Sequence, residues 1–404
     1  MSSMLREKGF RTLWVAQFVS IFGDFLALFG VISLVTFRLH GTVIQVTYLT
    51  IAYMLPLAVI GPIAGVFVDR LNVKRLMIFS DLTRATLALL LAFVIDIRQM
   101  YAIFFAISVF SSFFGPAQTV TLRAIVPTDK LLGANALMSQ AFYLVRIVSP
   151  AVAGALVAWL SEKVCFYLDA ASFLFSAAML STLTISRVVQ PLSGKNNFRK
   201  FLSDFTEGNR FIFTHSSLAM VFSAMMTAMF ILACFSPLIS IYVRDSLFAG
   251  SFLFGVISSM VGVGLIAGTQ LVRRVAANHS SEHVVVAGLV GLGLAVALLG
   301  LFHNIAMAGA GTFGVGLAIA LVIVPAQTLM QHDTPREMLG RVSSSFMAVI
   351  STAQVLGMLL SGYLARILGI ANLFKTSAIA VLVISAAFYV IVRARAATAP
   401  VPSS

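Results

Sequence analysis

Charged residues are scarce in this chain of 404 residues: only 10% are Asp, Glu, Lys or Arg, whereas 60% are hydrophobic. Soluble domains carry roughly 25% charged residues, so a soluble globular fold is excluded. Acidic residues are the rarer kind, since 14 Asp and Glu stand against 27 Lys and Arg. In a soluble protein the net charge of +13 would favour nucleic-acid binding. Between long apolar segments it indicates basic loops at the cytoplasmic face of a lipid bilayer.

The residue types that carry out catalysis are also few. The two cysteines, Cys165 and Cys234, both lie inside apolar segments, and neither a disulfide framework nor a metal site follows from them. All six histidines lie at the ends of apolar segments or between them. No phosphate-binding glycine loop, nucleophile–base pair or paired zinc-ligand spacing is present. We therefore expect no enzyme activity, no cofactor, no metal site and no nucleotide as the energy source.

Long apolar segments dominate what remains. Windows of about 20 apolar residues, the length that crosses a bilayer, recur twelve times along the chain. The sequence therefore predicts an all-α membrane protein with twelve transmembrane helices. The predicted spans are residues 11–37, 42–68, 76–95, 99–122, 134–160, 164–186, 216–243, 252–272, 283–302, 306–331, 341–366 and 371–392.

Lys and Arg residues gather in alternate connections between these spans, beginning with the basic N-terminal segment before residue 11. Because basic loops stay on the cytoplasmic side, both termini are predicted to lie in the cytoplasm. The first apolar segment is too long for a signal peptide, contains an acidic residue and lacks a small-residue cleavage site. We interpret it as a retained span of a multi-pass protein of the cell (inner) membrane.

An internal repeat divides the chain into two halves. Pro116-Ala-Gln-Thr119 near the end of the fourth span recurs as Pro325-Ala-Gln-Thr328 near the end of the tenth, and the similarity extends into the following span. Repeats of this kind are typical of transporters. We predict two pseudo-symmetric six-helix halves, residues 1–186 and 216–404. Residues 187–215 join them as a cytoplasmic linker with an amphipathic helix, or alternatively as a plain tether.

The connection between the second and third spans is short and strongly basic. It contains Asp69, Arg70, Lys74 and Arg75, and Gly65 precedes Asp69 by one helical turn, where a neighbouring helix can approach closely. A tight charged turn between two spans is suited to gating and to fixing orientation. The corresponding place in the second half, after Gly268, has lost the acidic residue.

Several ionisable residues fall inside the predicted spans, where a charge costs at least ~2.5 kcal/mol at the helix centre. Asp24 and Arg146 lie near the middle of the first and fifth spans, and they are our candidates for proton coupling. Asp81, Arg84 and Asp169 form a predicted intramembrane charge network, in which Asp81 and Arg84 share one helix face. The alternative for each is a fixed ion pair that only holds helices together.

A broad cavity for an amphipathic ligand is predicted from flexible and aromatic residues, because Met and Phe repack readily around variable ligands. The alternative is that these side chains simply face lipid or other helices. The candidates are Phe22, Phe25, Met226, Met229, Phe230, Gln327 and Gln354.

These motifs carry a resemblance to a known family. The spacing Gly65-x3-Asp69-Arg70-x3-Lys74-Arg75 resembles the loop 2–3 signature of the major facilitator superfamily of secondary transporters, with Asn72 where the family usually has Gly. Asn is the next residue most tolerant of a left-handed backbone. The first span and the segments around Asp81, Asp169 and Gly340-Arg341-Val342 resemble the macrolide-efflux and enterobactin-exporter type of drug:proton antiporters. The resemblance implies the major facilitator fold, and it adds Arg341 to the gating residues.

The predicted function is therefore a secondary active exporter of a small amphipathic organic molecule, such as a drug or a siderophore, coupled to protons or another ion. A lipid or lysophospholipid flippase and a metal exporter on the same fold remain open. A channel or membrane enzyme is disfavoured, because neither a pore-lining ring nor a catalytic cluster is present. We expect a monomer in the bilayer, with a small-molecule substrate and no nucleic acid as partner.

Overall fold

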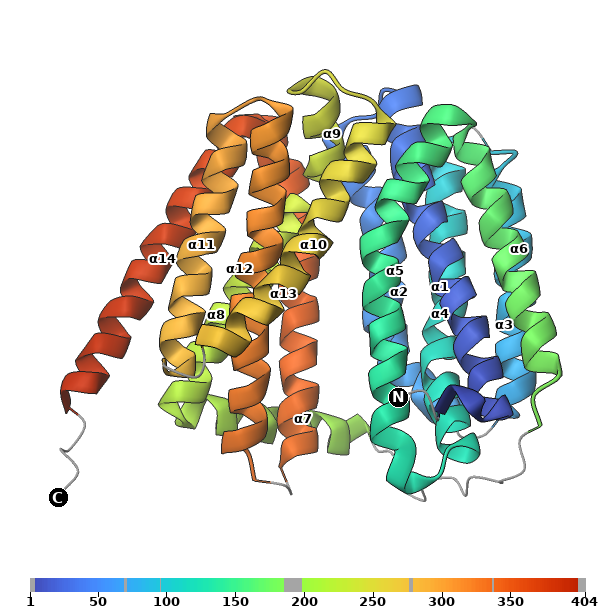
Figure 1. Ribbon diagram of the computed structural model, residues 1–404, viewed down its shortest axis with the longest axis horizontal. Helices are drawn as coiled ribbons and strands as arrows, with labels where there is room; N and C mark the ends of the chain where they lie inside the picture. Colours follow the sequence, from blue (N-terminus) through green and yellow to red (C-terminus); the bar gives the residue numbers. More distant parts are fainter. Residues whose placement is uncertain are drawn as a thin grey trace. The chain divides into compact units, whose positions relative to one another are not determined.

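The structure is a computed structural model, and it describes residues 4–68, 71–94, 96–184, 198–275, 279–335 and 338–398 (Figure 1). Regular secondary structure in these ranges is entirely helical. Helices suit a bilayer because they satisfy every backbone hydrogen bond within one segment. Up to the linker they are η1 (Met4–Arg6), α1 (Lys8–Ser33), the π-helical turn η2 (Leu34–Arg38), α2 (Val43–Val68), α3 (Val73–Leu91), α4 (Ile97–Ile125), η3 (Thr128–Lys130), α5 (Leu131–Trp159) and α6 (Glu162–Ser181).

The later helices follow the same pattern of long apolar segments with short connections. They are α7 (Phe198–Thr214), α8 (Ser216–Phe235), α9 (Leu238–Asp245), α10 (Ser251–Val275), α11 (Ser281–Leu301), α12 (Ile305–Asp333), α13 (Leu339–Leu368) and α14 (Ile370–Thr398). Helix α7 occupies the linker segment for which the sequence predicted an amphipathic helix. The predicted span 216–243 is divided into α8 and the short helix α9.

Eleven helices within the described ranges are long and apolar enough to cross a membrane, and the predicted all-helical membrane fold is confirmed. The remaining predicted span, residues 76–95, corresponds to α3. This helix has 19 residues but carries Lys74, Arg75, Asp81 and Arg84. Helix α3 is thus long enough to cross a membrane, but its four charged residues make it less apolar than the other eleven helices.

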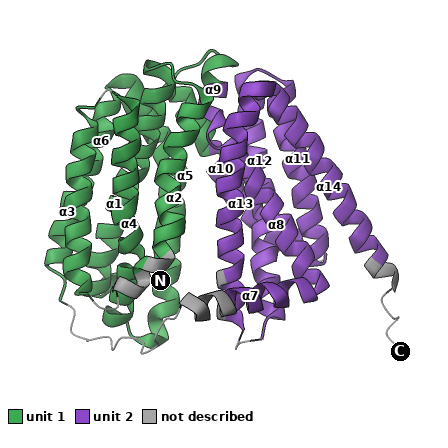
Figure 2. Ribbon diagram, turned by 180° about the vertical axis from the view of Figure 1, so that it is seen from behind, with its two compact units in different colours: residues 1–196, 243–259 green, residues 197–242, 260–404 purple. Residues whose placement is uncertain are grey.

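The chain divides into two compact units (Figure 2). Unit 1 comprises residues 1–196 and 243–259, and unit 2 comprises residues 197–242 and 260–404. In unit 1, α1 packs against α5 and α6, α3 packs against α4 and α6, and α2 packs against α4. In unit 2, α11 packs against α12 and α14, while α7 and α8 both pack against α13.

Glycine residues allow close helix crossings in both units, as is usual where lipid gives no hydrophobic driving force for association. In unit 1, a Cβ added to Gly30 would lie 2.8 Å from the Cβ of Cys165 on α6. In unit 2, a Cβ added to Gly316 on α12 would overlap the carbonyl oxygen of Val261 on α10. Each unit therefore has at least one crossing that no larger residue fits without movement.

Unit 1 includes a segment that is distant in sequence, residues 243–259. The Arg244 guanidinium donates to the carbonyl oxygens of Thr36 at 2.7 Å and Gly41 at 2.9 Å, where the first span ends. On α5, the backbone N–H of Ala151 donates to the Ser259 hydroxyl at 3.0 Å. These contacts attach the end of α9 and the first half of α10 to the first half of the chain.

The start of α3 corrects one expectation. Asn72 was expected to support a left-handed backbone, but its φ of −71° and ψ of 102° are extended. Its side-chain oxygen accepts a hydrogen bond from the backbone N–H of Arg75 at 3.1 Å, so Asn72 is the N-cap of α3. Asn is among the residues preferred at this position, because its side chain satisfies a free N–H of the first turn.

Candidate functional site

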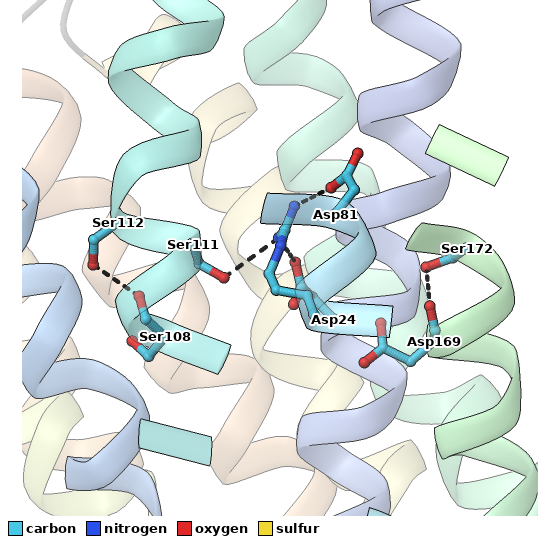
Figure 3. Close-up of polar contacts among 8 residues, drawn as sticks. Asp24, Asp81, Ser108, Ser111, Ser112, Asp169 and Ser172 are labelled. Atoms are coloured by element: carbon cyan, nitrogen blue, oxygen red, sulfur yellow. Dashed lines mark hydrogen bonds and ion pairs between the residues drawn. The ribbon is translucent and has the colours of Figure 1, made fainter. Parts of the chain in front are cut away.

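Four ionisable side chains from three helices of unit 1 meet in its interior. Helix α1 contributes Asp24, α3 contributes Asp81 and Arg84 one turn apart, and α6 contributes Asp169. Figure 3 shows the three aspartates in one close-up, and its dashed lines mark the polar contacts that surround them. The sequence placed these residues inside spans, and the structure brings them together in one cluster, which we call the aspartate–arginine cluster.

Arg84 lies at the centre of this cluster. Its Nη2 atom donates to Asp81 Oδ1. Its Nη1 atom lies 3.4 Å from Asp24 Oδ2 and 3.3 Å from the Ser111 hydroxyl of α4. The Arg84 side chain is only 3% exposed, so its charge depends on these neighbours for compensation.

Two aromatic rings complete the surroundings of Arg84. The guanidinium carbon lies 4.2 Å from the ring centroid of Phe173 on α6 and 4.8 Å from that of Phe114 on α4. The negative face of an aromatic ring attracts a cation, most strongly where water is excluded. The rings therefore stabilise the charged guanidinium without adding a further negative charge.

The carboxyl groups in the cluster outnumber the guanidinium group. Three carboxyl groups share a single guanidinium, and Asp81 makes its shortest contact. Asp24 is the most accessible of the three carboxyl groups, with a side chain that is 14% exposed. A carboxyl group with a long ion-pair contact and partial access is chemically able to take up and release a proton, because its charged form is only partly compensated.

Gly23 determines how closely α6 approaches this part of α1. A Cβ added to Gly23 would lie 2.8 Å from Asp169 Oδ1 and would overlap the Ser172 hydroxyl. The residue next to Asp24 must therefore be glycine for Asp169 to reach its observed position.

Arg146, which the sequence analysis grouped with Asp24, lies elsewhere. It is an exposed residue of α5, and it forms no ion pair within the part of the chain that the structure describes. Arg84, and not Arg146, contacts Asp24. The sequence shows the depth of each residue in its span but not the rotation of the helix, so it could not identify the partner of Asp24.

Ser111, Phe114 and Phe173 were missed as contributors to the cluster. Hydroxyl and aromatic residues occur throughout these spans, so nothing in the sequence distinguished Ser111 and Phe114. For Phe173 one signal was available, because it follows Asp169 by one helical turn.

The predicted gating residues fall partly outside the described residues. Asp69 and Arg70 are not among the described residues, and for Gly65 only the backbone is described. Arg75 is exposed. Lys74 donates to the carbonyl oxygens of Ser181 at 2.6 Å and Leu183 at 2.8 Å. It thereby satisfies free carbonyl groups at the end of α6 with a positive charge, which is favourable at a helix C-terminus.

Arg341 belongs to a contact between α7 and α13 in unit 2. Its guanidinium pairs with Glu207 at 2.8 Å, and the Ser345 hydroxyl donates to the Phe205 carbonyl oxygen at 3.0 Å. Gly208 makes this approach possible, because an added Cβ would lie 2.6 Å from the Arg341 carbonyl oxygen. The linker helix is thus attached to α13.

The predicted cavity residues are distributed over both units. In unit 1, Phe22 and Phe25 are half-buried, and the Phe25 ring lies 6.1 Å from that of Phe142. In unit 2, Met229 is buried and its sulfur accepts a weak contact from Gln354 Nε2 at 3.7 Å. The other three differ in exposure: Met226 is exposed, whereas Phe230 and Gln327 are half-buried.

Comparisons with known proteins agree with this architecture. A sequence profile described as Major Facilitator Superfamily matches residues 13–351 and, in a second match, residues 221–404. Macrolide efflux protein A of Streptococcus pyogenes is 24% identical over 381 residues, which cover 91% of this chain and 92% of that protein. The lysophospholipid transporter LplT of Photorhabdus laumondii is 24% identical over 344 residues, which cover 81% of each chain.

A solved structure shows the same fold. The crystal structure of the nucleoside transporter NupG superposes with a TM-score of 0.73 at 14% sequence identity, covering 94% of this chain and 98% of that one. At this identity the likeness concerns the fold alone. The profile match spans most of the chain and the described residues are helical with many apolar spans, so the protein is a membrane transporter and not an enzyme. The chain belongs to the Major Facilitator Superfamily.

Proposed function

We propose that this transporter exports a small amphipathic organic molecule and that proton exchange at Asp24 drives the export. The observation that carries the proposal is the long contact of 3.4 Å between Asp24 and an arginine that is already bound to Asp81. Placing an acidic side chain inside the membrane costs free energy, and such residues are usually functional. Asp24 combines such a position with partial access.

Protonation of Asp24 changes the balance of charge around Arg84. With Asp24 ionised, Arg84 attracts both α1, through Asp24, and its own helix, through Asp81. With Asp24 neutral, the attraction between α3 and α1 weakens, while the contacts of Arg84 with Asp81 and Ser111 remain. A proton on Asp24 therefore alters the interaction between two helices of unit 1, which is a means of favouring one transport state over another.

The movement is that of alternating access, in which one half of the transporter rocks against the other around a fixed site. We assign the halves to residues 1–186 and 216–404, with residues 187–215 as their cytoplasmic linker. The bias of Lys and Arg supports an inner-membrane protein with both termini in the cytoplasm. The transporter acts as a monomer, with the proton as its coupling ion.

The substrate class rests on relatives and on side-chain chemistry. Macrolides and lysophospholipids, named for two relatives, are both molecules with extended apolar and polar parts. Phe22, Phe25, Met226 and the other cavity candidates suit such ligands because they adapt their packing. Arg146, exposed on α5, is proposed to bind an anionic group of the substrate.

The basic turn after α2 is proposed as the gate. Asp69 and Arg70 would hold the two halves together on the cytoplasmic side, with Gly65, Lys74, Arg75 and Arg341 supporting the same contact region. The hydrogen bonds from Lys74 to the end of α6 support this role, because they hold the start of α3 in place next to the turn.

The coupling proposal is tested with Asp24→Asn in proteoliposomes. We expect efflux driven by an imposed proton gradient to fall to background, while the amount of folded protein on size exclusion stays at the wild-type level. The control is Asp245→Asn, which removes a half-exposed carboxyl group of unit 1 and should leave efflux unchanged. Wild-type efflux in Asp24→Asn vesicles would contradict the proposal.

The substrate is identified with a panel of macrolides, dyes, siderophores and lysophospholipids, each with and without a protonophore. Transport of a macrolide or dye that stops with the protonophore supports proton-driven drug export. Transport of lysophospholipids alone, unaffected by the protonophore, would replace that function with lipid movement across the bilayer.

A further inference from the structure

Asp169 on α6 is a buried carboxyl group without a counter-charge of its own. It is 1% exposed, and in the described part of the chain it forms no ion pair and its Oδ1 atom has no hydrogen-bond partner. The Ser172 hydroxyl donates to the backbone carbonyl of Asp169 at 2.7 Å, as Figure 3 shows. An ionised carboxylate in this position would lose its hydration, and its Oδ1 atom would receive no compensating hydrogen bond.

The electrostatic surroundings of Asp169 do not compensate a negative charge. One positive group in the cluster faces two other carboxyl groups, and Asp81 makes its shortest contact. A second carboxylate next to ionised acids is disfavoured by like-charge repulsion. The titratable and charged groups that face Asp169 are Asp24 from α1, Tyr53 from α2, Asp81 and Arg84 from α3, and Cys165 on α6 itself.

A chelated metal ion is one way to neutralise several buried carboxylates. Within the ranges that the structure describes, no group of three or more His, Cys, Asp or Glu side chains is arranged to hold a metal. Protons are the other way to neutralise buried carboxylates, and they need no fixed coordination geometry.

Asp169 lies next to the residue that we propose to exchange protons with water. An added Cβ on Gly23 would be 2.8 Å from Asp169 Oδ1, and Gly23 immediately precedes Asp24 in the chain. Asp24 is partly accessible, whereas Asp169 is enclosed. This placement gives a path in which a proton reaches Asp169 through Asp24 and leaves by the same carboxyl group.

We propose that Asp169 is a second proton-binding residue, so that the loaded cluster carries two protons, one on Asp24 and one on Asp169. In the loading direction, hydronium transfers a proton to the Asp24 carboxylate and becomes water. Asp24 passes that proton to Asp169 and takes up another. Release follows the same transfers in reverse, and Asp81 remains ionised against Arg84 throughout. The inference rests on the proposed function, because it takes these protons to be the ones exchanged during transport.

Infrared spectroscopy of the full-length protein in lipid bilayers tests the assignment without any substrate. Protonated carboxyl groups have a C=O absorption that carboxylates lack, and its integrated intensity relative to the amide band counts them. We take the intensity of the double variant Asp24→Asn/Asp169→Asn as the background and subtract it. In samples equilibrated at acidic pH, we expect the remaining intensity of wild type to be twice that of either Asp24→Asn or Asp169→Asn. The double variant should show none from the cluster. The matched control is Glu162→Gln, which removes a buried carboxyl group of α6 that is paired with Arg38 and should leave the intensity unchanged.

An unchanged intensity in Asp169→Asn would overturn the proposal. If that variant fails to fold, wild type alone decides the question: in D2O the two carboxyl bands should shift separately, the accessible one faster. A wild-type cluster intensity equal to that of one carboxyl group would equally exclude a second proton. Loss of efflux is not part of this measurement. If the Asp24→Asn variant still exports substrate while wild type shows two carboxyl bands, the proposed function fails and the two-proton assignment stands.

Discussion

The two units of this transporter are stabilised by different interactions in their interiors. The buried polar residues of unit 1 include Asp81, Arg84, Glu162 and Asp169, whereas those described in unit 2 are only Ser and Thr. Close glycine crossings occur in both units, such as Gly23 against Ser172 in unit 1 and Gly316 against Val261 in unit 2. A duplicated fold can thus hold its buried charge in one copy while both copies use the same close helix packing.

The strongest test of this difference is removal of the charge at the centre of unit 1. Arg84→Gln leaves three buried carboxyl groups without a cation, and breaking a buried pair in this way costs about 3–5 kcal/mol. We expect a large loss of thermal stability, measured by unfolding of the purified protein in detergent. Arg273→Gln, which removes an exposed arginine of unit 2, is the control and should change the unfolding temperature little. Equal effects of the two variants would contradict the comparison.

A pair of glycine substitutions sharpens the comparison between stability and coupling. Gly23→Ala in unit 1 and Gly316→Ala in unit 2 both introduce a methyl group where a neighbour already lies, at a cost of about 1–3 kcal/mol each. We expect both to reduce stability. Only Gly23→Ala should also change the dependence of efflux on the proton gradient, because it displaces Asp169. Proton-dependence that changes equally in Gly316→Ala would mean that coupling is shared by both units.

The basic turn that we propose as the gate keeps its acid in the first half and has lost it in the second, where Val272 stands in the place of Asp69. Asp69→Asn should therefore slow turnover about tenfold, equivalent to about 1.4 kcal/mol, without removing substrate binding. Binding to the purified protein and efflux from vesicles are measured side by side. Loss of binding would show that Asp69 acts at the substrate site and not at a gate.

The smallest effect is expected at an exposed ion pair of unit 2. Glu207 and Arg341 are both substantially exposed, and such pairs contribute about 0–1 kcal/mol because water and salt screen them. Glu207→Gln should change the unfolding temperature by far less than Arg84→Gln does. A comparably large change would mean that the contact between α7 and α13 is a main support of unit 2.

The spans could be predicted because apolar length is a local property. Even α3 was predicted, from residues 76–95. The observed helix begins earlier, at Val73, and so includes the charged residues Lys74 and Arg75. The depth of Asp24 and Arg84 was also readable from the distance to the ends of their spans. The contact between them was not, because it depends on how α1 and α3 rotate about their axes. Packing sets this rotation, through contacts such as Gly23 against Ser172.

Other features depend on interactions that no local pattern contains. The aromatic rings of Phe114 and Phe173 face Arg84 from two helices that are far apart in sequence. Asn72 was associated with a left-handed backbone because the family has Gly there, but a capping side chain explains it better. The roles of Asp69 and Arg70 stay predictions, since both lie outside the described residues.

The attachment of residues 243–259 to unit 1 has a consequence for synthesis of the protein. A chain made from its N-terminus folds its first domain as soon as that domain's residues have emerged. Arg244 donates hydrogen bonds to the carbonyl oxygens of Thr36 and Gly41, and the Ser259 hydroxyl accepts one from the Ala151 N–H, so these groups have no such partner until much later. Unit 1 therefore reaches its final form only after the ribosome has translated codon 259, well into the second repeat.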